Sequence, residues 1–210
     1  MSVLWTERDL QIAEALTRRL RILSVDQVAR IWWPGAGGQR VARRRLRKLA
    51  EAGLIERRVV NVGVIPQQTT PLVCWVPGDA EPNVREVANQ AKARWGRGAV
   101  PQEVVSATRL AANLFGSSVA GLPPVHHRDH DLLLGEVYVI YHTTKPAEAA
   151  CWCGHDGRSV ARELPRTDVL LIDAKLNVIR AVESAGRIGP REIVAFHERC
   201  FHAALPYELW

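Results

Sequence analysis

The sequence has no long apolar run, no sustained repeat and few cysteines. No stretch approaches about 18 uncharged apolar residues, which excludes a membrane-spanning helix. The lack of a repeat excludes a coiled coil and collagen. Four cysteines in 210 residues do not make a disulfide scaffold, so we expect reduced thiols and a cytoplasmic protein. Glu7, Arg8 and Asp9 interrupt the first apolar residues, and no signal peptide is expected.

Motifs for common small-molecule chemistry are also missing. Gly35, Gly37 and Gly38 lie between two expected helices rather than after a strand, which does not fit a nucleotide-binding loop. No serine-hydrolase elbow is present. The sequence therefore predicts no cofactor, and no small-molecule substrate is evident.

The chain does have a concentrated positive charge. Its length of 210 residues allows one large domain or two small ones, and 47% of its residues are hydrophobic. Its net charge is +6. Residues 1–60 hold 13 of the 28 basic residues but only six acids, a local charge of +7, and the other 150 residues carry −1. Such a concentrated field is typical of a module that binds a polyanion.

Three helices are expected in this basic segment. Thr6 with Asp9 and Ser24 with Gln27 have the spacing of capping boxes, so each pair predicts the start of a helix. A third helix is expected over residues 39–52. Its exposed face is expected to carry Arg40, Arg43, Arg44, Arg45, Arg47 and Lys48.

Two strand-like runs follow the third helix, at Leu54 to Ile65 and at Pro71 to Val76, and we expect them to form a hairpin. Three helices and a hairpin, with the third helix most basic, resemble a winged helix-turn-helix. A helix fits the major groove of DNA, where arginines reach guanine edges or phosphates. We assign this unit to residues 1–77. The residues expected to bind duplex DNA are Arg40, Arg43, Arg44, Arg47, Lys48, Arg57 and Arg58.

Residues 78–125 are expected to form a helical connector. Val84 to Trp95 and Pro101 to Phe115 are both interpreted as helices, with glycines between them. Packing between two domains is favoured over a dimerisation helix, because no residue here carries chemistry. A homodimer stays open, since no heptad indicates one.

Residues 126–210 predict a small α/β domain, so the fold class is α+β. Expected helices cover 129–141 and 190–203, and expected strands cover 149–153, 168–172, 178–183 and 207–210. The order is helix, three strands, helix, strand.

That order resembles the core of restriction-endonuclease-like folds, and the residues resemble the replication-relaxation family of plasmids and other mobile elements. Members of that family join an N-terminal winged helix to such a core. The residues that carry the resemblance are His130, Asp131 and Glu136 in HDLLLGEVYV, Asp168 in RTDVLLID and Glu183 in RAVESAGR.

The resemblance implies a test for nuclease activity. Active members of the superfamily hold a divalent metal between carboxylates on neighbouring strands and use a lysine two residues after the second one. Asp168 and Glu183 fit the carboxylates, with Glu136 as a third, but Ala185 stands where the lysine is expected. A core without catalysis is therefore favoured. A nuclease that uses Mg²⁺ or Mn²⁺ is the alternative.

Cysteine and histidine pairs make a weaker candidate for structural zinc. Helical spacing places His197 and Cys200 on one face, and strand spacing does the same for Cys151 and Cys153. Neither spacing is that of a standard zinc finger, so core packing is the favoured interpretation.

The sequence thus predicts a DNA-binding protein that regulates transcription or replication of a plasmid or mobile element. The first alternative is a metal-dependent DNA nuclease. The second is a protein-interaction module without DNA contact.

Overall fold

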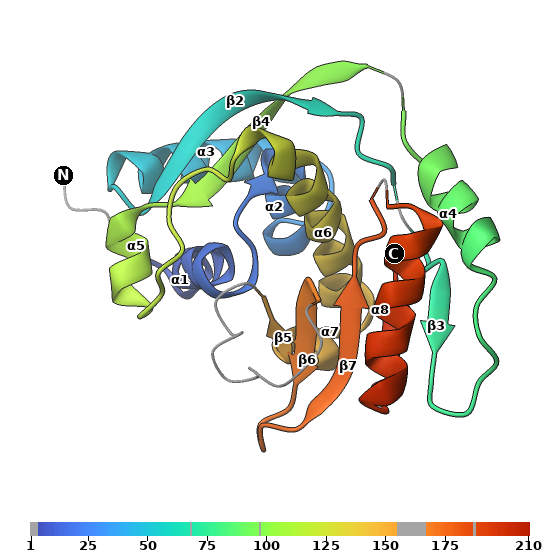
Figure 1. Cartoon of the computed structure of the whole chain (residues 1–210). Coiled ribbons are helices and arrows are strands. Elements are labelled where there is room, and N and C mark those ends of the chain that lie inside the picture. Colours follow the sequence, from blue (N-terminus) through green and yellow to red (C-terminus); the bar gives the residue numbers. More distant parts are fainter. Residues whose placement is uncertain (1–3, 68, 97, 155–166, 187) are drawn as a thin grey trace.

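A computed structural model describes residues 4–67, 69–96, 98–154, 167–186 and 188–210 of the chain. Its helices are α1 Glu7–Glu14, the π-helical turn η1 Ala15–Arg19, α2 Val25–Trp32, α3 Gly38–Glu51, α4 Val84–Ala93, α5 Arg109–Leu114, α6 Val125–Thr144, α7 Pro146–Ala150 and α8 Pro190–His202. Its strands are β1 Leu23–Ser24, β2 Ile55–Gly63, β3 Val73–Trp75, β4 Ala99–Ala107, β5 Trp152–Cys153, β6 Val169–Ile172, β7 Val178–Glu183 and β8 Tyr207–Leu209. The fold is α+β, with two sheets in the orders β1-β4-β2 and β3-β8-β7-β6-β5 (Figure 1).

Helices α1 and α2 begin where the capping boxes indicate, and α3 covers nearly the expected range. The hydroxyl of Thr6 accepts from the Asp9 N–H, and the Asp9 carboxylate accepts from the Thr6 N–H at 2.7 Å. Ser24 and Gln27 make the same reciprocal pair. Both predicted capping boxes are confirmed. Gly53, at a φ of +75°, follows the end of α3 and takes the left-handed conformation that commonly ends a helix.

The expected hairpin partner of the first strand is wrong. β2 pairs with β4 along nine residues, from Ile55 opposite Ala107 to Gly63 opposite Ala99. The segment expected as its partner contains β3, which instead pairs with β8 at the edge of the second sheet. The reason is burial: Trp75 of β3 packs its ring against Tyr207 of β8 at 5.5 Å between ring centroids, in the core of the second sheet.

The expected helix over residues 101–115 is also wrong, so the connector is only partly helical. The first part of that segment, up to Ala107, belongs to β4, and α5 begins only after Thr108, whose hydroxyl accepts from the Ala111 N–H at 3.2 Å. Val104 and Val105 are fully buried in the strand. Their branched side chains favour a sheet, and pairing with β2 satisfies the backbone there. The other expected connector helix is confirmed as α4.

The second half follows the predicted order. The expected helices correspond to α6 and α8, and the strands at 168–172, 178–183 and 207–210 correspond to β6, β7 and β8. The strand expected at 149–153 shrinks to the two residues of β5, because α7 occupies the preceding turn. β5 with β6 and β6 with β7 are antiparallel, whereas β7 and β8 are parallel.

Helices cover both faces of the second sheet. Leu171 and Val182 lie in one core cluster with Tyr138 of α6. Leu170 points to the opposite face and lies in a second cluster with Phe196 of α8. Because successive strand residues point to opposite faces, β6 contributes to both cores.

Helix α6 joins the two halves of the chain. It packs against α2 and contributes Leu132 to a small core with Val60 and Val62 of β2. In Figure 1, α6 runs between the long β2–β4 ribbon and the second sheet. The two sheets do not follow the expected domain boundaries. β3 lies within residues 1–77 but joins the second sheet, and β4 lies within residues 78–125 but joins the first sheet. None of the helices in the described ranges combines the length and apolar character that crossing a bilayer requires.

Candidate functional site

Helix α3 turns one face inward and the opposite face to solvent. Ala42, Leu46 and Leu49 are fully buried, at the spacing that places residues on one side of a helix. The turn before α3 has a left-handed residue, Gly37, with a φ of +83°. The inward side chains pack α3 against α2 and hold the outer face in a fixed orientation.

The outer face of α3 is a concentrated cationic surface. Arg40, Arg44, Arg47 and Lys48 are all exposed. No described residue forms an ion pair with any of these four, so their full charge is available to a ligand. We call these four residues the α3 basic face.

Two further predicted arginines are partly neutralised. Arg43 of α3 and Arg57 of β2 both form ion pairs with Glu103 of β4, the first at 3.4 Å. Their shared acid joins the end of the basic face to the β2–β4 ribbon. Arg58 is exposed, and no ion pair to it occurs among the described residues.

Arg45 does not belong to the exposed face, contrary to expectation. It forms an ion pair with the fully buried Asp9, and its Nε donates to the Asp9 carboxylate at 2.8 Å. Burial acts to raise the pKa of Asp9, but the hydrogen bonds from Arg45 and Thr6 outweigh it and lower that pKa. This arginine therefore fixes α1 against α3.

Two of the predicted acids lie side by side in the second sheet. The Glu183 carboxylate accepts from the Asp168 N–H at 2.9 Å and from the Thr167 hydroxyl at 3.0 Å. The Asp168 carboxylate accepts from the Ser184 N–H at 2.8 Å. Burial, and then the charge of Asp168, raises the pKa of Glu183 to about 7.

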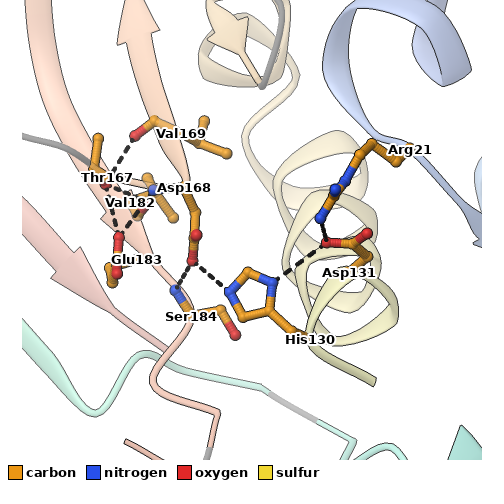
Figure 2. Close-up of polar contacts among 9 residues, drawn as sticks. All are labelled: Arg21, His130, Asp131, Thr167, Asp168, Val169, Val182, Glu183 and Ser184. Atoms are coloured by element: carbon orange, nitrogen blue, oxygen red, sulfur yellow. Dashed lines mark hydrogen bonds and ion pairs between the residues drawn. The ribbon is translucent and has the colours of Figure 1, made fainter. Parts of the chain in front are cut away.

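His130 of α6 lies between two carboxylates, as Figure 2 shows. Its Nε2 is 2.9 Å from Asp168 Oδ2, and its Nδ1 is 3.4 Å from Asp131 Oδ1. Burial acts to lower the pKa of His130, but its bonds to both carboxylates raise it to about 10. The imidazole is therefore charged at neutral pH. Arg21, which sequence reasoning missed, donates to Asp131 at 2.7 Å.

An open pocket of about 310 Å³ lies beside this cluster. It is lined by both His127 and His130, by Asp131 and Asp168, and by Arg19 and Arg21. No motif in the sequence joins these residues, because they come from the end of η1, from the segment between η1 and β1, from α6 and from the residue before β6. His130, Asp131 and Asp168 could have been singled out only because they lie in the motifs HDLLLGEVYV and RTDVLLID that carry the family resemblance.

Glu136, the third predicted acid, does not join the other two. Its carboxylate accepts from Gln27 at 2.8 Å and pairs with Arg30, both on α2. Residues 131 and 136 are five apart, which places them about 140° apart around a helix. The predicted three-acid site is therefore reduced to Asp168 and Glu183.

The zinc candidates are not brought together. Cys151 packs on the core cluster on the α6 side of the second sheet, and Cys200 is fully buried in the cluster on the α8 side. His197 bonds instead to the Tyr207 hydroxyl at 2.9 Å. Cys153 lies on β5. Across the residues that the structure describes, no group of three or more histidines, cysteines or acids is arranged to hold a metal ion.

Comparison of the chain with protein-family models, curated proteins and solved structures gives no match.

Proposed function

We propose that this protein binds duplex DNA through a winged helix-turn-helix in which α3 is the recognition helix and the β2–β4 ribbon is the wing. The order α1, β1, α2, α3, β2, β4 and the antiparallel β1-β4-β2 sheet support that assignment. The observation that carries the proposal is the α3 basic face, where four exposed cations have no ion-pair partner among the described residues. Such a face matches the charge of a phosphate backbone.

The wing contacts DNA along its side in this proposal. The Gly63 N–H, at the end of β2, donates to Asp129 of α6 at 2.9 Å. The end of the ribbon is thus tied to α6. Arg57 and Arg58, nearer the base of β2, are the wing residues that we place against the DNA backbone.

The second sheet serves as a platform without catalysis in this proposal. Its strand arrangement and the order α6, α7, β5, β6, β7, α8, β8 favour a nuclease-like core, with α7 as an added short helix. The Asp168 carboxylate, however, is already bonded to His130 and to the Ser184 N–H. The charged His130 neutralises Asp168 where a metal ion would otherwise bind. With Glu136 turned toward α2, the arrangement does not fit a metal-dependent site. We propose a role in transcriptional or replication control of a plasmid or mobile element, as the family resemblance implies.

The test is salt-dependent binding to a mixed-sequence duplex, measured by fluorescence anisotropy. We expect log K to fall linearly with log salt, with a slope of about −0.9 for each phosphate neutralised. The double variant Arg44→Ala, Arg47→Ala should reduce that slope by about two. The matched control is Arg85→Ala, Arg191→Ala, which removes two exposed arginines from α4 and α8. An unchanged slope in the first variant would contradict the assignment of α3.

The nuclease is a second candidate, favoured by the position of Asp168 and Glu183 beside each other, where the Asp168 backbone N–H donates to the Glu183 carboxylate. It predicts duplex cleavage in Mg²⁺ or Mn²⁺ that is lost in Asp168→Ala. DNA that stays intact with both metals contradicts it. A protein-interaction module predicts no salt-dependent DNA binding at all.

A further inference from the structure

A second pocket lies on the flank of the α3 basic face. Its volume is about 310 Å³, and its walls come from α1, from the end of α2 and from α3. Arg8 and Trp33 line it on one side, and Val41, Arg44, Arg45 and Lys48 line it on the other. We call it the Trp33 pocket.

The charge of the Trp33 pocket is positive. Four of its lining residues are basic, and none of its lining residues is acidic. The charge of one of them, Arg45, is neutralised by its ion pair with Asp9. Arg8, Arg44 and Lys48 are exposed and make no ion pair with the described part of the chain. Three uncompensated cations around one hollow create a site for an anion.

Trp33 gives the pocket a fixed wall. It follows α2, and its backbone N–H donates to the Ala29 carbonyl at 2.8 Å. Its side chain packs against the main core cluster. The guanidinium of Arg8 lies over the indole ring, 5.1 Å from the ring centroid. This cation–π contact restrains Arg8 at the mouth of the pocket and leaves its N–H groups as donors.

We propose that the Trp33 pocket binds one phosphodiester group of the duplex, held by Arg8, Arg44 and Lys48. This inference rests on the proposed DNA-binding function and adds Arg8 and Trp33 to the interface. Arginine and lysine donors form charge-assisted hydrogen bonds with phosphate oxygens. A phosphate held beside α3 fixes the depth and rotation of that helix in the groove, because backbone contacts set orientation and base contacts read sequence. The site lies on the same surface as the α3 basic face, so one duplex reaches both.

The first test compares Arg8→Gln with Arg85→Gln in duplex binding at several salt concentrations. Arg8→Gln should weaken binding about three- to tenfold and reduce the salt slope by about one, whereas Arg85→Gln should match the wild type. Trp33→Phe keeps an aromatic ring and the charge count. It should weaken binding with little change in slope, because Arg8 stays charged but loses much of its restraint. A wild-type slope in Arg8→Gln overturns the proposal.

The second test observes the pocket directly. The chain has seven tryptophans, and the Trp33 indole N–H signal is identified in an NMR spectrum by its loss in Trp33→Phe. The wild-type protein is titrated separately with inorganic phosphate and with a short duplex. We expect both to shift the Trp33 signal, and the phosphate shift to disappear in Arg8→Gln. A shift with phosphate but not with duplex overturns the DNA assignment, and no shift with either overturns the anion site.

The outcomes separate this inference from the proposed function. If Arg44→Ala, Arg47→Ala loses affinity while Arg8→Gln binds as the wild type does, DNA binding through α3 stands and the Trp33 pocket is wrong. If the wild-type protein binds no duplex, both proposals fail as DNA interfaces.

Discussion

The Nε2 atom of His130 lies 2.9 Å from Oδ2 of Asp168, which joins the first half of α6 to the beginning of β6. The same ring faces Asp131, and Asp131 is bonded to Arg21 just before β1. One charged imidazole thus connects the N-terminal segment, α6 and the second sheet. Because its charge depends on pH, the stability of this connection does too.

We expect the free energy of unfolding to depend on pH through His130. The bonds to Asp131 and Asp168 raise its folded-state pKa to about 10, above an ordinary value near 6.5. A raised histidine pKa gives stability that is complete below about pH 6.5 and is lost as pH rises toward 10. In this window one proton corresponds to at most about 1.4 kcal/mol per pH unit, and partial exposure of the ring lowers the total stabilisation below that limit.

Denaturant unfolding of the wild type and of His130→Gln between pH 6.5 and 9.5 measures this effect. The wild type should lose stability as pH rises, and the variant should lose less over the same range. His202→Gln, at an exposed histidine of α8, is the control and should follow the wild type. Parallel curves for His130→Gln and the wild type would show that the imidazole is not charged in the folded protein.

The contact of Glu136 with α2 predicts a structural rather than a catalytic effect of its removal. Glu136→Ala leaves Arg30 and the buried Gln27 without this acceptor and should cost about 2–3 kcal/mol in the free energy of unfolding. Asp26→Ala is the matched control, because Asp26 pairs with the same Arg30 at 3.0 Å on the surface of α2. That exposed pair should contribute less than about 0.5 kcal/mol. Equal losses in urea denaturation would contradict this role for Glu136.

Local signals predicted the first three helices well. Capping side chains act within four residues of the backbone that they bond, so Thr6 with Asp9 and Ser24 with Gln27 could be recognised from spacing alone. The basic outer face of α3 could also be predicted locally, because the spacing of its apolar residues shows which side of the helix faces inward. The exception is Arg45, whose inward position depends on Asp9, 36 residues earlier.

Long-range pairing was not predictable in the same way. The apolar positions of residues 101–115 fit a helix, but they also fit a strand up to Ala107 and a short helix after Thr108. Whether this segment forms a helix or a strand depends on β2, which lies about forty residues earlier and whose backbone pairs with it. The contact of His130 with Asp168 likewise depends on how α6 lies across the sheet. Neither residue has a local signal for its partner.

The turn between α2 and α3 should be intolerant of a side chain at Gly38. A Cβ atom there would overlap the carbonyl group of Trp33, which is backbone and cannot rotate away. Gly38→Ala should therefore cost about 1–3 kcal/mol in thermal or chemical unfolding. Gly189→Ala provides the comparison, because its Cβ would meet only the flexible Glu192 carboxylate at 3.0 Å. A smaller loss at Gly38 than at Gly189 would mean that the turn is looser than the structure indicates.

Glu103 should restrain the DNA affinity of the protein. It is the shared ion-pair partner of Arg43 and Arg57, so two of the predicted DNA-binding cations face an acid in the free protein. Glu103→Gln removes that charge and keeps the side-chain shape. Both arginines then become available to phosphates, and we expect about three- to tenfold tighter binding with a steeper salt slope.

Glu198→Gln, at an exposed acid of α8, changes the net charge equally and controls for long-range attraction. Anisotropy titrations of both variants decide the point: equal gains would mean that only net charge matters, and no gain would place Arg43 and Arg57 outside the interface. Loss of the partly exposed pairs should lower stability by less than about 1 kcal/mol, so both variants remain folded during the measurement.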